Sequence, residues 1–382
     1  MPPKPKNQNA SNKDNSQIVG IFKLEQLKAD SGLYAGYEWA PYNPDIIVQK
    51  KGDFSTYDKM RRDDQIKAVL WLKKFMILSS GWDIKSSEDK KEEQKDVIIF
   101  LKNVLSNLSL PDFGDALTNI LTHIDYGFSI TEPVFKNIDS QIILQKLKTR
   151  APHTFLLETD DSGELEKIRQ YTSGADIVIE KRNIKKLIHM IHQQEFGVPY
   201  GVSDLQGCYR AWFSKDVVIR FWNMYLERFG NPHFIAKTPS KISPTERSNL
   251  KTIFKTLQTS TGIIIPEGVE IDLVFPNAGK TGFEDAIDKY NMMIARSMLI
   301  PDLIGVGGKE ISGGSFALGE KHFDIFFMTI TKHRIDLERV INRHIIQPLA
   351  RWNFGIPAEE IPRWILNPLE DANKQEYLKL WT

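Results

Sequence analysis

The residues of this chain whose types most resemble a chemical site are the glycines, the serines and the single lysine within residues 305–315. A phosphate-binding P-loop needs the pattern Gly-x-x-x-x-Gly-Lys-Ser/Thr directly after a buried strand. Here Lys309 follows Gly308 but is itself followed by Glu310, and a helical pattern precedes the loop. A dinucleotide-binding loop fails for the same reason, because no strand enters it. One alternative stays open, a phosphate-binding enzyme that uses this loop.

Two histidines close together in the sequence, His189 and His192, could suggest a metal site. Their surroundings have the pattern of a strand, and residues three apart in a strand face opposite sides of the sheet. No third ligand lies nearby in the sequence, so we interpret both as core or surface histidines rather than metal ligands.

Nucleophilic and nuclease chemistry are not supported either. Cys208 is the single cysteine, without a nearby histidine and without a second cysteine at CxxC spacing. No cluster of aspartates and glutamates stands out as a two-metal centre. We therefore predict no catalytic residue, no metal and no cofactor, and a protein that is not an enzyme. A single cysteine also fits a reducing compartment.

Composition narrows the class of protein further. The chain has 382 residues, 41% of them hydrophobic, which is enough for a large core and for two or three modules. A formal net charge of +1 is not that of a polycation made to bind nucleic acid. No apolar run reaches about 18 residues, so we expect no membrane span. Residues 1–16, rich in Pro, Lys, Asn and Ser, predict a disordered arm rather than a signal peptide.

Hydrophobic spacing predicts an α+β first half. Apolar residues recur at helical intervals in residues 63–78, 97–108 and 113–124. From residue 141 to residue 193 the pattern becomes that of short strands, with a hairpin turn at residues 160–163.

The second half predicts long helices around a small module. An aromatic-rich helix spans about residues 204–229, with Ser203 as a plausible N-cap. A strand, a helix and a hairpin of strands follow within residues 230–281. Two further helices lie on either side of the glycine-rich loop, and Pro348 predicts a kink or break in the second of them.

Several short motifs recur in a defined order and spacing from about Arg62 to about Pro368. In chain order these are Gly81-Trp82 with Ile84, Tyr126-Gly127-Phe128-Ser129 with Glu132, Pro199-Tyr200-Gly201-Val202-Ser203, Glu227-Arg228-Phe229-Gly230-Asn231-Pro232, residues 294–301, Gly314-Ser315-Phe316-Ala317 with His322, and residues 341–355. With these motifs and this order of elements, the chain resembles the portal proteins of tailed phages, in particular the Mu-like portal family.

The resemblance implies an α+β portal fold with a defined series of parts. After the arm of residues 1–16, these are an α/β wing, a first stem helix, a small α/β clip, a second stem helix, a glycine-rich tunnel loop, a long kinked tunnel helix and a crown. The wing maps to residues 17–202, the first stem helix to 203–229, the clip to 230–281 and the second stem helix to 282–300. The tunnel loop maps to residues 301–315, the tunnel helix to 316–353 and the crown to 354–382. The last part is short, so we expect a small crown or C-terminal tail, or a truncated chain.

The resemblance also implies a function: a ring-shaped channel, usually of twelve copies, at one capsid vertex. Double-stranded DNA is packaged through such a ring by the terminase and later ejected. The implied partners are other copies of the chain, double-stranded DNA without sequence preference, the large terminase subunit, a head-completion adaptor, and the major capsid and scaffolding proteins. The implied location is the virion, after assembly in the bacterial host cytoplasm. A monomeric α+β structural adaptor without a channel is the alternative from another class.

Candidate site residues follow from the same assignment. Lys309 and Lys321 could contact DNA phosphates, while Glu310 weakens the attraction. The residues expected to face DNA are Gly307, Gly308, Lys309, Glu310, Ser312, Gly313, Gly314 and Lys321. The candidates for contacts between subunits are Trp212, Trp222, Phe326 and Phe327, and those for docking at the clip are Lys237, Lys241 and Glu267.

Overall fold

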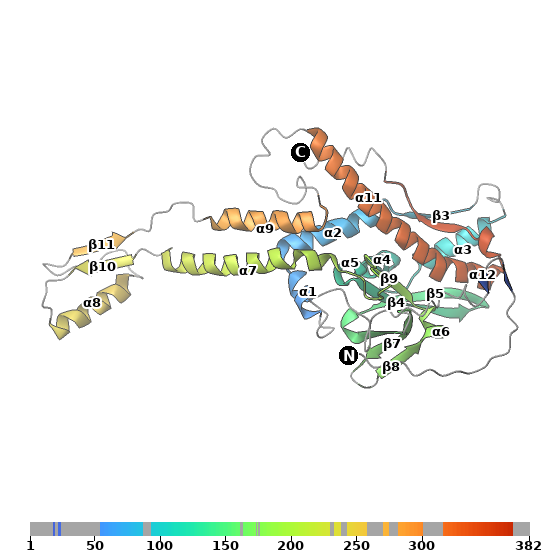
Figure 1. Cartoon of the computed structure of the whole chain (residues 1–382), viewed down its shortest axis with the longest axis horizontal. Helices are drawn as coiled ribbons and strands as arrows, with labels where there is room; N and C mark the ends of the chain where they lie inside the picture. The colour runs from blue at the N-terminus through green and yellow to red at the C-terminus, as the bar shows by residue number, and fades with distance from the viewer. Residues whose placement is uncertain are drawn as a thin grey trace. The chain divides into compact units, whose positions relative to one another are not determined.

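The structure is a computed structural model, and it describes most of the chain between residues 54 and 369. The described residues are 18–19, 22–23, 54–86, 93–160, 163–172, 174, 176–229, 233–237, 243–257, 270–274, 282–300 and 316–369. The chain divides into two compact units (Figure 1). We call Met1–Thr56, Asp83–Ser203 and Glu338–Ile365 the sheet body, and Tyr57–Trp82, Asp204–Leu337 and Leu366–Thr382 the helical body.

The helices of the sheet body form where apolar residues recur on one face. In α3 (Lys95–Ser106) the residues Val97, Leu101, Val104 and Leu105 are buried. The predicted helix over residues 113–124 is divided into α4 (Phe113–Ile120) and α5 (His123–Tyr126). The Asp112 side chain caps α4 by accepting a hydrogen bond from the Asp115 N–H at 2.7 Å.

The strands of the sheet body form two antiparallel three-stranded sheets. The first has the order β5-β4-β9, with β4 at Phe128–Ile138, β5 at Gln141–Arg150 and β9 at Ile188–Ile191. The second has the order β6-β7-β8, with bounds Phe155–Thr159, Leu165–Tyr171 and Asp176–Glu180. The predicted turn between β6 and β7 is confirmed, because the Gly163 N–H donates to the Asp160 carbonyl at 2.9 Å.

Smaller elements complete the sheet body. Strand β12 (Arg363–Leu366) pairs with β3 (Trp82–Lys85) in a two-stranded sheet. The other small elements are β1 (Ile18–Val19), β2 (Phe22–Lys23), α6 (Lys181–Ile184) and two short 3-10 turns at Pro152–Thr154 and Ala358–Glu360. The residues of helix α1 (Ser55–Met60) are divided between the two bodies.

Two glycines of the sheet body bring separate motifs together. Gly127 and Gly201 both have positive φ angles, +88° and +62°. A Cβ atom on Gly201 would lie 2.5 Å from the Gly127 carbonyl oxygen and closer still to that of His192. The His192 N–H donates to the Gly127 carbonyl at 2.7 Å, and the Val202 N–H donates to the His192 carbonyl at 2.9 Å. The backbones therefore approach too closely for any residue with a side chain.

The segment before the helical body is fixed by side chains from the same motifs. The Ser203 hydroxyl donates to the Asp125 carbonyl at 2.6 Å. The Tyr200 hydroxyl accepts from the Leu157 N–H at 2.9 Å, which joins this segment to β6. The Tyr200 ring also packs edge-on against Phe128, with 5.6 Å between the ring centroids.

The predicted interruption of the long second-half helix is a turn of π-helix. Helix α11 (Phe316–Ile341) continues into a π-helical segment (Asn342–Ile346) and then α12 (Gln347–Phe354), which has Pro348 in its first turn. A proline there lacks the N–H that would continue the regular ladder. The Asn342 side chain bonds both backbone groups of Trp364, at 2.7 and 2.8 Å, and so holds this turn against β12.

The helical body consists of helices with one small module between two of them. Helix α7 (Asp204–Phe229) runs beside α9 (Phe283–Ser297), and α2 (Asp64–Leu78) packs against α9 (Figure 1). Between α7 and α9 come β10 (His233–Lys237), α8 (Pro244–Leu257) and β11 (Glu270–Val274). Strands β10 and β11 pair antiparallel, which confirms the predicted strand, helix and strand. The predicted strand over residues 262–268 lies outside the described residues.

No helix among the described segments combines the length and the apolar composition that crossing a membrane requires.

Substitution of Gly201 should reveal the cost of the close backbone contact. Gly197→Ala is the matched control, because Gly197 also has a positive φ (+74°) but has open space around its Cβ position. We expect Gly197→Ala to lower the free energy of unfolding by about 1 kcal/mol from backbone strain alone. Gly201→Ala should cost more than about 3 kcal/mol, because the backbone must also move. Equal costs in denaturant unfolding would contradict the close contact.

The half-buried His189, whose Nε2 atom is itself buried, predicts an acid-sensitive stability. Its Nε2 atom is buried without a hydrogen-bond partner among the described residues, and burial lowers the pKa of His189 to about 4. Between pH 6.5 and 4 the unfolded chain therefore takes up a proton that the folded chain does not. The free energy of unfolding should fall through this window by up to about 1.4 kcal/mol per pH unit, and His189→Gln should flatten the fall. An unchanged slope in the variant would refute this account.

Candidate functional site: the helical body

Helices α2 and α7 are joined by ion pairs at both ends of their contact. The Lys73 Nζ lies 2.6 Å from the Asp204 Oδ2, and the two side chains are only 2% and 5% exposed. Eleven positions further along α7, the Lys215 Nζ lies 3.0 Å from Asp63 and 2.5 Å from Asp64. The beginning of α2 lies at Lys215 of α7, whereas Lys73, further along α2, lies at Asp204, the first residue of α7. The two helices therefore run antiparallel.

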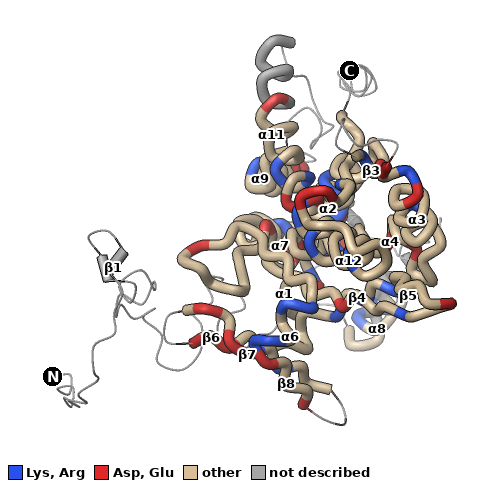
Figure 2. The backbone as a smooth tube through the Cα atoms, turned by 90° about the vertical axis from the view of Figure 1, so that its right-hand side faces the viewer, with Lys and Arg blue, Asp and Glu red and all other residues tan. Residues whose placement is uncertain are grey.

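One of these carboxylates has a second task, and another responds electrostatically to its lysine. The Asp63 side chain caps α2 by accepting from the Ile66 N–H at 3.1 Å. Lys215 lowers the pKa of Asp64 chiefly through their hydrogen bond. Burying an ammonium group is costly unless a carboxylate is held close to it. Figure 2 shows acidic and basic residues next to one another on α2.

Helices α7 and α9 approach closely at one end of their contact and stack aromatic rings towards the other. A Cβ atom on Gly207 would overlap the Ser297 hydroxyl, so a side chain at this position would force that hydroxyl to move. The Cys208 thiol lies 3.8 Å from the Ile294 carbonyl, and burial raises the pKa of Cys208 to about 12. A thiol with such a pKa is a poor nucleophile. Further along, Trp222 stacks on Phe283 with 6.4 Å between ring centroids.

A buried arginine ties α11 to the end of α2. The Arg334 guanidinium donates to the Ile77 carbonyl at 2.9 Å and to the Ser80 hydroxyl at 3.0 Å. It also donates to the Asn367 carbonyl, and the Asn367 side chain donates to the Ser80 carbonyl at 3.0 Å. Arg334 and Asn367 together therefore satisfy the Ile77 and Ser80 carbonyls, which the end of α2 leaves open next to the Gly81-Trp82 motif.

One face of α7 carries apolar side chains that remain exposed. At 100° per residue, Tyr209, Phe213, Phe221 and Met224 lie on one side of the helix, opposite the side that buries Cys208. The exposed Arg210 and Arg220 lie in the same sector, between these apolar side chains. Phe213 is 52% exposed and Phe221 is 55% exposed. We call these four residues the α7 stripe. Helix α11 has a comparable exposed row, formed by Ile325, Met328 and Ile335.

The residues predicted for subunit contacts have different surroundings. Trp212 and Trp222 are half-buried on α7, and the ring of Trp222 already stacks on Phe283 within the same chain. Phe326 is fully buried within the chain, whereas Phe327 is half-buried. Exposed apolar area in α11 therefore lies at the neighbours of Phe326 rather than at Phe326 itself.

Most of the predicted DNA and clip residues lie outside the described part of the chain. The tunnel-loop residues between 301 and 315 and the clip residues Lys241 and Glu267 belong to segments that the structure does not describe. Lys237 is the last residue of β10 and Lys321 lies in the first turns of α11, but their side chains are not described.

Sequence reasoning missed the lysines that position α7. Lys73 and Lys215 read as ordinary charged residues of amphipathic helices, and their partners are 131 and 151 residues away. One signal was present in the pattern: Lys73 and Lys74 fall beside Val69, Leu70, Met76 and Ile77, the apolar residues that α2 buries.

Removing one partner of the buried pair should destabilise the helical body. Lys73→Met leaves Asp204 buried without its cation, and we expect a loss of about 3–5 kcal/mol in denaturant unfolding. The control is Arg220→Met, which breaks the exposed Arg220–Asp216 pair on the same helix and should cost no more than about 0.5 kcal/mol. Lys73→Met combined with Asp204→Leu should recover part of the loss. Similar costs for the two single variants would show that the buried pair does not anchor α7.

Comparison with known proteins identifies relatives of this chain. The family profile described as "Portal protein of Mu bacteriophage" matches residues 54–382. The portal protein of Escherichia phage Mu is 23% identical over 300 residues, which cover 78% of this chain and 56% of the Mu protein. The chain thus spans about half the length of the curated relative that it matches.

Solved structures support the fold. A chain in the neck of an empty gene transfer agent particle has a TM-score of 0.60 at 12% identity, over 86% of this chain and 89% of that one. A chain in the neck of the native particle, computed with C12 symmetry, has a TM-score of 0.55 at 12% identity, over 86% and 88%. At such identity the likeness shows the fold alone. Because the family profile matches most of its length, the chain belongs to the portal protein family of Mu-like bacteriophages.

Proposed function

We propose that this chain is the subunit of a portal ring whose copies meet through the α7 stripe. The observation that carries the proposal is an apolar face left exposed on a helix whose opposite side is already fixed by ion pairs and by α9. Exposed apolar patches on an anchored element are typical of protein–protein contacts. A related fold occurs in a neck computed with C12 symmetry, which favours a ring of twelve copies.

In this proposal α7 and α9 are the stem helices, and the β10-α8-β11 module is the clip. Residues 17–202 are the wing, and α11 with α12 is the tunnel helix. The ring lies at one capsid vertex of the virion, and double-stranded DNA passes through it during packaging and ejection. A net charge of +1 suits a channel that must not hold its cargo, since each phosphate contact adds strongly to affinity.

Each part of the proposed ring subunit has its own partners. The clip, through Lys237, Lys241 and Glu267, docks the large terminase subunit and later a head-completion adaptor. The wing contacts the major capsid and scaffolding proteins during head assembly in the host cytoplasm. The loop of residues 301–315 faces DNA, with Lys309 and Lys321 near the phosphates.

Charged substitutions in the α7 stripe should prevent ring formation without unfolding the subunit. Phe213→Glu and Phe221→Glu each place a carboxylate on a face that another copy must bury, which costs several kcal/mol per contact. The control is Asn223→Glu, which adds the same charge to an exposed position about a quarter turn away from the stripe. Native mass spectrometry should find rings of about a dozen copies for the wild type and the control, and mainly monomers for the stripe variants.

Two outcomes would overturn the proposal. A wild type that stays monomeric at every concentration and salt condition favours the monomeric adaptor. Rings that form equally well in both stripe variants place the contacts elsewhere on the subunit. Equilibrium dialysis against ATP tests the remaining alternative, a phosphate-binding enzyme, which requires saturable binding that Lys309→Ala removes.

A further inference from the structure

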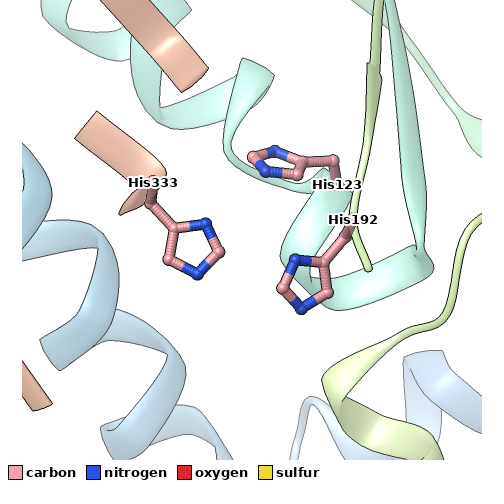
Figure 3. A group of neighbouring side chains, drawn as sticks. All are labelled: His123, His192 and His333. Atoms are coloured by element: carbon pink, nitrogen blue, oxygen red, sulfur yellow. The ribbon is translucent and has the colours of Figure 1, made fainter. Parts of the chain in front are cut away.

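Two buried histidines of the sheet body lie side by side in the fold although they are far apart in the sequence. His123 begins α5 and His192 follows β9 directly. Their side chains are 2% and 5% exposed, and their ring centroids are 5.8 Å apart in an edge-to-face arrangement (Figure 3). Their ligating nitrogens lie within 4.8 Å of each other. The sequence interpretation of His192 as a core or surface histidine did not foresee this neighbour.

The surroundings of His123 fix which of its nitrogens can bind a ligand. Its Nδ1 lies 3.0 Å from the Ile120 carbonyl oxygen, which also accepts a hydrogen bond from the Ser129 hydroxyl at 2.7 Å. A carbonyl oxygen only accepts, so Nδ1 carries the proton and donates it. Nε2 of the neutral ring then keeps its lone pair. Metal-binding histidines characteristically donate their other ring N–H to a backbone carbonyl in this way.

The backbone around His192 is equally well held. Its N–H donates to the Gly127 carbonyl at 2.7 Å and its carbonyl accepts from the Val202 N–H at 2.9 Å. Gly127 immediately follows α5, the helix that carries His123. The two imidazoles are therefore presented by segments that hydrogen-bond to each other, and little movement is needed to bring their nitrogens to a common ligand.

We propose that His123 and His192 bind a divalent first-row transition-metal ion in the sheet body. Imidazole is a preferred ligand of zinc, copper and nickel. Two nitrogens on one tetrahedral zinc ion, each at about 2.0–2.1 Å, stand about 3.4 Å apart. The ligating nitrogens of His123 and His192 already lie within 4.8 Å of each other. The two histidines supply two positions, and water or other ligands complete the shell. His333, also labelled in Figure 3, belongs to α11 of the helical body, and the proposal does not rest on it.

Such an ion would link α5 to the end of β9 at the junction that Gly127 and Gly201 form. This role is independent of ring assembly and of DNA passage. A metal bound only by the folded state raises the stability of that state.

The test is zinc binding by the full chain, expressed without a polyhistidine tag and stripped with a chelator. Competition with a chromophoric zinc chelator should find one zinc ion per chain, with a dissociation constant in the micromolar range or below. His123→Gln and His192→Gln should each weaken it by at least about tenfold, as expected for loss of a ligand. The matched control is His153→Gln, an exposed histidine of the same body, which should bind zinc as the wild type does.

Thermal unfolding provides the second readout and shows whether each variant folds. Added zinc should raise the unfolding midpoint of the wild type and of His153→Gln, but not that of the other two variants. X-ray absorption of the zinc-loaded wild type needs no variant and should show at least two imidazole ligands. Absence of binding below about 100 μM, equal affinity in all variants, or fewer than two imidazoles at the zinc would each overturn the proposal, with no bearing on ring formation.

Discussion

Two buried lysine–carboxylate contacts determine how the helical body is built. Lys73 on α2 is almost fully buried, and a buried charge is tolerated only beside an opposite charge. Its partner is Asp204, so the first turn of α7 must lie against the middle of α2. Lys215 imposes the same condition at the beginning of α2, where Asp63 also caps the helix. Two such contacts fix both the separation and the direction of the helices. An apolar contact of similar area would allow the helices to slide or rotate.

The anchored portion of α7 explains why the rest of the helix can carry an exposed apolar face. In its first three turns Leu205, Cys208 and Ala211 are buried on the side that α2 and α9 hold, while the other side stays exposed. The glycine at position 207 permits the close approach to α9. Beyond Lys215, α9 covers one side through the Trp222–Phe283 stack, and the opposite side keeps Phe221 and Met224 exposed. A helix held so firmly at one end presents a preformed surface, and a preformed surface loses little entropy when a second copy covers it.

Sequence periodicity predicted the elements well and their partners poorly. The 26-residue α7 and the strand-helix-strand module were predictable, since apolar spacing and the Ser243-Pro244 helix start are local signals. The order of these elements along the chain was enough to indicate the portal family. The partners of Lys73 and Lys215 were not predictable, because a buried ion pair depends on chain segments that meet only in the fold. The same holds for His123 beside His192, and for the π-helical turn where Pro348 had indicated only a kink.

In the proposed ring, copies of this chain meet through the α7 stripe. A cryo-electron microscopy reconstruction of the purified full chain, without imposed symmetry, tests this contact most directly. We predict a closed ring in which Tyr209, Phe213 and Phe221 are buried against the adjacent subunit while Lys73 and Asp204 stay paired within each copy. A ring in which the stripe faces solvent, or particles that contain single copies only, would contradict the account.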